Sequence, residues 1–139
     1  MNIDLNWIDG SEMSAVSLVE PVSWWFKFSD GASLRVDAQW RVVTEEGVQV
    51  TSADHGHQFG LPEPVDAGGR AMRVLAHAKV LGAAVLKPAG DLVFDFSNGA
   101  QLEILTTSSA YEGWSLTSPN GDEIIGLGGG RVQVLKGNF

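Results

Sequence analysis

The chain contains no cysteine, and that absence alone removes several kinds of chemistry. Disulfide bonds, zinc sites built from thiolates and a cysteine nucleophile all need the missing thiol. Basic residues are also scarce, because 9 Lys and Arg stand against 17 Asp and Glu and the formal net charge is −8. Nucleic acids and anionic lipids are themselves negatively charged, so we expect neither a nucleic-acid partner nor a membrane partner.

A secretory leader and long apolar runs are missing as well. The N-terminus has no basic stretch followed by an apolar one, and the weakly polar run 74–86 is interrupted by His77, Lys79 and Gly82. A membrane-spanning helix needs about 20 consecutive apolar residues. These features favour a soluble protein of the cytoplasm. Apolar residues still make up 44% of the 139 residues, which is enough to bury a core, and we expect one domain over 1–139.

What the sequence does contain is an internal repeat. Residues 26–36 read FKFSDGASLRV and residues 94–104 read FDFSNGAQLEI, at an offset of 68. Further along, Trp40 corresponds to Trp114 at an offset of 74. The second copy therefore carries six additional residues (74 minus 68), which fall within 105–113.

The matched segments have the pattern of β-hairpins, because Asp-Gly and Asn-Gly lie between alternating apolar residues. A three-residue loop over 29–31 pairs Phe26 with Leu34, whereas a two-residue loop would pair Phe26 with Arg35. Opposed side chains share a face of the sheet, so we expect the loop that keeps apolar residues together. The expected inner faces carry Trp24, Phe26, Phe28, Ala32, Leu34 and Val36 in the first copy and Leu92, Phe94, Phe96, Ala100, Leu102 and Ile104 in the second.

The expected fold class is α+β and mostly β. Two duplicated antiparallel meander units, at about 15–53 and 83–127, share one core, with a connecting loop and a single helix at about 54–80. Asp66 is the expected N-cap of this helix, which runs to about Lys79 and covers an open edge or end of the sheets. Each unit continues from its hairpin into further strands, at 40–44 and 48–52 in the first copy and at 114–117 and 123–127 in the second.

A candidate metal site lies in the run Asp54-His55-Gly56-His57. Two histidines at i and i+2 on a strand point the same way, so His55 and His57 could reach one cation. No third ligand is evident from the spacing. The alternative is a polar loop, which Gly56 and the nearby prolines favour.

Arg70, Arg73 and His77 are spaced i, i+3 and i+7 along the expected helix. This spacing gathers them on one side, where Arg70 and Arg73 could meet an acidic ligand or partner. The alternative is an ordinary solvated helix face.

Aromatic residues supply the remaining candidates. Tyr111 and Glu112 stand just before Trp114, and a carboxyl beside two aromatic rings is a setting that a general acid uses. The alternative is that Tyr111 and Trp114 are amphipathic core residues with one polar end in water. Trp25 falls on the outward face of the first hairpin, where it would anchor a partner or lie under a second layer of the protein.

The second repeat carries two longer motifs. Residues 94–102 fit F-x-F-x-[DN]-G-x-x-L, residues 111–121 fit Y-E-x-W-x-[IL]-x-x-P-x-G, and a glycine pair follows at 128–129. In these motifs, over about 91–130 with a weaker echo in 24–47, the chain resembles a family of small uncharacterised bacterial proteins. The resemblance implies no assigned activity. Some similar small acidic domains are suspected immunity proteins of toxin systems, which implies a binding role.

These features favour a noncatalytic binding or interaction module that needs no cofactor. The sequence shows no nucleophile–base set and no complete set of metal ligands. One alternative is an immunity-like protein whose acidic surface neutralises a basic toxin. Another is a small ligand- or metal-binding enzyme domain that uses His55 and His57, or Tyr111 and Glu112. Free sheet edges could also pair two copies into a homodimer.

Overall fold

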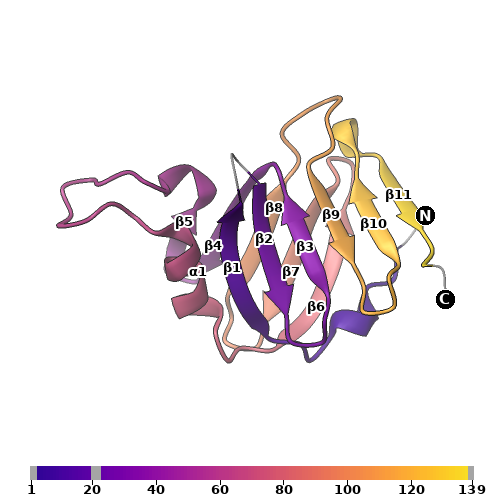
Figure 1. Ribbon diagram of the computed structural model, residues 1–139, viewed down its shortest axis with the longest axis horizontal. Coiled ribbons are helices and arrows are strands. Elements are labelled where there is room, and N and C mark those ends of the chain that lie inside the picture. Colours follow the sequence, from indigo (N-terminus) through magenta and orange to yellow (C-terminus); the bar gives the residue numbers. More distant parts are fainter. Residues whose placement is uncertain (1–2, 20–22, 138–139) are drawn as a thin grey trace.

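The computed structural model describes residues 3–19 and 23–137, which form two antiparallel sheets packed face to face (Figure 1). The single α-helix of these residues is α1 (Ala67–Leu75), and short 3₁₀ turns are η1 (Asn6–Ile8), η2 (Ser52–Asp54) and η3 (Gly128–Gly130). The expected fold class, α+β and mostly β, is confirmed. The strands are β1 (Met13–Val19), β2 (Ser23–Phe28), β3 (Ser33–Val36), β4 (Gln39–Thr44), β5 (Gly47–Thr51), β6 (Val80–Leu86), β7 (Asp91–Phe96), β8 (Gln101–Leu105), β9 (Trp114–Thr117), β10 (Glu123–Gly126) and β11 (Val132–Leu135).

The two repeats exchange strands between the sheets. One sheet has the order β1-β2-β3-β9-β10-β11 and the other has the order β5-β4-β8-β7-β6. The first repeat therefore places β1, β2 and β3 in one sheet and its remaining strands in the other. The second repeat places β6, β7 and β8 in the second sheet and its remaining strands in the first. The expectation that each meander continues through its own tryptophan strand is wrong, since Trp40 pairs with Ile104 and Trp114 pairs with Val36. The exchange places both indole rings, which are fully buried, in the shared core.

The hairpin register is the one that the apolar pattern predicts. Phe26 lies opposite Leu34, and Phe94 lies opposite Leu102. Gly31 closes the first hairpin at a φ of 95°, a conformation that a side chain would disfavour. All twelve side chains expected on the two inner faces are buried.

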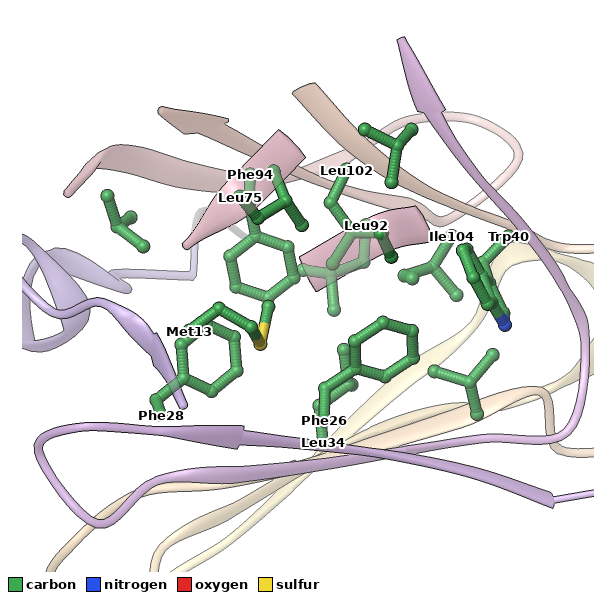
Figure 2. Packing of buried hydrophobic residues seen from close by; sticks show 14 of the residues in the cluster. Met13, Phe26, Phe28, Leu34, Trp40, Leu75, Leu92, Phe94, Leu102 and Ile104 are labelled. Atoms are coloured by element: carbon green, nitrogen blue, oxygen red, sulfur yellow. The ribbon is translucent and has the colours of Figure 1, made fainter. Parts of the chain in front are cut away.

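The core lies between the sheets and is built from both repeats (Figure 2). Phe28 and Phe94 meet there with ring centroids 5.4 Å apart. Trp40 packs edge-on against Phe26, with centroids 5.3 Å apart. Each of these contacts joins a side chain of one sheet to a side chain of the other, so neither sheet buries its aromatic residues alone.

Helix α1 closes one open side of the sandwich, where it packs against the edge strands β1 and β5. Asp66 is the N-cap, as expected, and its side chain accepts a hydrogen bond from the amide of Gly69. The helix ends at Leu75, so the expected end near Lys79 is wrong. Ala76 has an extended backbone and His77 adopts a φ of 68°, which turns the chain toward β6.

Candidate functional site

The largest difference between the repeats lies at one end of the sandwich. The crossover from β3 to β4 is residues 37–38, whereas the crossover from β8 to β9 is residues 106–113. The second is longer by six residues (eight minus two), as the sequence offsets predict. It reaches over the shorter crossover, where the amide of Asp37 donates to the carbonyl of Gly113 at 2.8 Å.

The long crossover is held in place from several sides. The Ser108 hydroxyl accepts hydrogen bonds from the amides of Ala110, at 3.1 Å, and Tyr111, at 2.9 Å. Gly128 packs so closely that a Cβ added to it would lie 2.4 Å from the backbone of Ala110. The Tyr111 side chain is nevertheless 80% exposed. The fold therefore holds an aromatic ring in water on a backbone that is well fixed.

An ion cluster includes Glu112, the residue that follows Tyr111 in the chain. The Arg35 guanidinium contacts the Glu112 carboxylate directly and lies 3.7 Å from the carboxylate of Asp37. Asp37 also accepts a hydrogen bond from the Ser23 hydroxyl. Two carboxylates thus share one guanidinium, and the cluster keeps one net negative charge.

Trp25 belongs to the same surface, because it lies opposite Arg35 in the register of β2 and β3. The Lys27 ammonium lies 4.7 Å from the centroid of the Trp25 ring, within cation–π distance. Trp25 is half-buried. The main contacts of α1 are with β1 and β5, and those of η1 are with β6, so neither has its main contacts on β2. Arg35 therefore links Trp25 on β2 to Glu112, the residue that directly follows Tyr111 in the chain.

A pocket of about 430 Å³ opens on the other side of Asp37. Gln39, Ser52 and His55 contribute to its lining, and the Ser52 hydroxyl donates to the Gln39 side chain at 2.7 Å. Thr107 of the long crossover completes the wall. These groups can accept and donate hydrogen bonds.

The two histidines do not share a strand. Residues 52–54 form η2 and residues 55–66 form a loop, so the expected strand geometry is wrong and the alternative of an irregular polar loop holds. His55 Nδ1 accepts from the amide of Ala67, while His57 stacks on Phe59 with centroids 5.5 Å apart. Within residues 3–19 and 23–137, no group of three or more His, Asp or Glu is placed to hold a metal ion.

The basic row on the helix is shorter than expected. Arg70 and Arg73 lie on α1, but His77 lies beyond its end and is not part of the row. Arg73 is exposed and Arg70 is half-buried. An acidic ligand for these two arginines stays a prediction.

Sequence reasoning did not single out Arg35 or Asp37 as site residues. The hairpin register puts Arg35 opposite Trp25, on the outer face of the sheet. Its partner Glu112 is 77 residues away in the chain, and no local pattern shows that contact.

The fold defines the class of protein: a small, mostly β sandwich made of two repeats that exchange strands, with one lengthened crossover. The chain belongs to the family of unknown function DUF6188, whose family model matches residues 6–136. This agrees with the resemblance to a small uncharacterised domain family. No curated protein and no solved structure matches the chain. In the part of the chain that the structure describes, no helix has the length and apolar character to cross a membrane.

Proposed function

We propose that the protein is a noncatalytic binding module that contacts another protein through its crossover surface, defined as Trp25, Arg35, Tyr111 and Glu112. The observation that carries this proposal is the 80% exposure of Tyr111 on a crossover fixed by hydrogen bonds and glycine contacts. A rigid aromatic ring loses little conformational freedom when it is buried by a partner. Tyr and Trp are also enriched among the residues that dominate binding energy.

The charge of the molecule favours a basic partner. At the crossover surface the carboxylates of Asp37 and Glu112 stand against Arg35 and against Lys27 over Trp25, so the favourable field is that of the whole molecule, whose net charge is −8. Such a field speeds the approach of a positively charged protein and suppresses binding to acidic ones. An immunity-like protein that neutralises a basic toxin is the specific form of this function that the family resemblance suggests.

Binding is favoured over catalysis by the surroundings of Glu112. Its carboxylate is engaged by Arg35 at the surface, and it is not enclosed between aromatic rings as a general acid would be. The enzyme alternative that uses Tyr111 and Glu112 therefore has less support. Cytoplasmic location, and the lack of nucleic-acid and membrane binding, stay predictions.

The test is a pull-down from lysate at low and at high salt, with the wild type and with Tyr111→Ala. We expect one stoichiometric partner that is recovered better at low salt, and a loss of affinity of about tenfold or more for Tyr111→Ala. Trp25→Ala should weaken recovery as well. Val48→Ala is the matched control, because Val48 is an exposed apolar residue on β5, outside the crossover surface.

Two results would contradict the proposal. The first is that no stoichiometric partner is recovered at either salt concentration. The second is a partner that binds the Tyr111→Ala and wild-type proteins equally well.

A further inference from the structure

The loop between η2 and α1 carries a projection, the finger, defined as residues 56–65 (Figure 1). Its base is paired like a short ladder, since the amide of Gly56 donates to Val65 at 2.9 Å and the amide of Val65 donates to His57 at 2.8 Å. These backbone hydrogen bonds give the base of the finger a defined conformation.

The tip of the finger presents apolar side chains to water. Phe59 is 66% exposed and Leu61 is 39% exposed. Phe59 has a φ of 50°, a left-handed conformation that is unfavourable for a bulky residue and that the surrounding structure must maintain. His57 stacks on its ring, and the Gln58 side chain donates to the carbonyl of Leu61 at 2.8 Å. These contacts hold the ring outward.

A groove whose lining residues are mostly apolar lies between the edge strands β6 and β11. Figure 1 shows β11 on the side of the molecule opposite the finger. Its volume is about 540 Å³. Neither β6 nor β11 pairs with a second strand within the described residues, so both sheets end at this groove. The residues that line it are Ile3, Ala84, Val85, Leu86, Gly130 and Val132, with Lys87 at its rim.

The finger and the groove carry opposite charges. The finger contains the exposed Glu63 and no Lys or Arg, and the exposed Asp66 follows it, ahead of Arg70 and Arg73 on α1. Lys87 lines the groove, and Arg131 directly follows one of its lining residues. The apolar tip with Glu63 beside it is therefore complementary to a groove whose lining residues are mostly apolar and include Lys87, and both belong to the same chain.

We propose that the finger of one copy inserts into the β6–β11 groove of a second copy. The contact is heterologous, because different surfaces of the two copies meet, so it extends head to tail unless the rotation between copies closes a ring. It does not use the crossover surface and is independent of the proposed function. One loop in one groove is a small interface, so the association is weak, in a range of about 0.1–1 mM.

Sedimentation equilibrium of the full chain tests this proposal from about 20 μM to 1 mM, at about 25 and 300 mM salt. The weight-average mass should rise above 14.8 kDa with concentration, and less so at high salt. Phe59→Ala should weaken the association by about tenfold or more. Tyr111→Ala is the matched control, an exposed aromatic residue outside the contact, and should associate like the wild type.

A mixing experiment tests the head-to-tail geometry. Ala84→Glu fills the groove with a negative charge but keeps the finger, whereas Phe59→Ala keeps the groove. Both positions are exposed, so both variants should fold, which near-ultraviolet circular dichroism checks. Each variant alone should stay near 14.8 kDa, and the mass of an equimolar mixture should rise with concentration toward twice that value and never exceed it. A wild type that is monomeric throughout, an association that Phe59→Ala does not weaken, or a mixture that does not associate would overturn the proposal.

Discussion

Replacing Phe94 with alanine is expected to lower the free energy of unfolding by about 3–5 kcal/mol. The Phe94 ring is fully buried between the sheets, where it meets Phe28 of the other repeat at 5.4 Å (Figure 2). Removing the ring loses the burial of its apolar surface and leaves a cavity that two opposed sheets cannot close fully. Urea unfolding followed by tryptophan fluorescence measures the change.

Phe26→Ala should lower the free energy of unfolding by a similar amount, because Phe26 is the matching position of the first repeat and is also fully buried. Val48→Ala is the control, and as a substitution on an exposed edge it should change the stability by less than about 0.5 kcal/mol. A loss below about 1 kcal/mol at either phenylalanine would show that the common core is not packed as described.

Gly128→Ala is the second substitution for which we expect a large effect. An added Cβ would lie 2.4 Å from the backbone nitrogen and carbonyl carbon of Ala110, and no flexible side chain can move away to make room. Either the strain is retained, or the long crossover moves. We expect a loss of stability of about 2–3 kcal/mol in thermal or urea unfolding.

Gly82→Ala is the matched control for Gly128→Ala, because an added Cβ at Gly82 meets nothing within 4 Å and Gly82 does not have a positive φ. Its effect on stability should be small. If Gly128→Ala proved as harmless as Gly82→Ala, the close packing of η3 against the crossover would be contradicted. Because the crossover carries Tyr111, Gly128→Ala should also weaken binding of a partner at the crossover surface.

Local sequence patterns were sufficient to predict the two hairpins. The alternation around Asp30-Gly31 and Asn98-Gly99 predicted both the loops and the register, since only one register keeps the apolar residues on one face. The six-residue difference between the crossovers also followed from the repeat offsets alone. These predictions hold because each depends on residues that are near neighbours in the chain.

The pairing of distant strands could not be predicted in the same way. The strand of Trp40 has the same apolar alternation whether it pairs with β3 or with β8, so its pattern does not choose a partner. The helix end was wrong for a related reason. His77 adopts a left-handed backbone that its residue type does not require, while Lys79 is held by a bridge to Glu12 on a distant segment.

Parts of the candidate site could not be predicted from the sequence either. The outward direction of Trp25 could be predicted, because it follows from hairpin register. The contact between Arg35 and Glu112 depends on how the long crossover folds over the other repeat. The finger was recognised as an irregular loop, but the exposure of Phe59 depends on the hydrogen bonds and stacking that hold the tip.

The exchange of strands between the repeats is the central claim, because it forms the core and brings the two crossovers together. Nuclear Overhauser effects between backbone protons test it most directly. The structure predicts contacts between Leu34 and Leu116 and between Val42 and Leu102, which join β3 to β9 and β4 to β8. Contacts between Trp40 and the β3 strand of its own repeat, in place of these, would contradict the account.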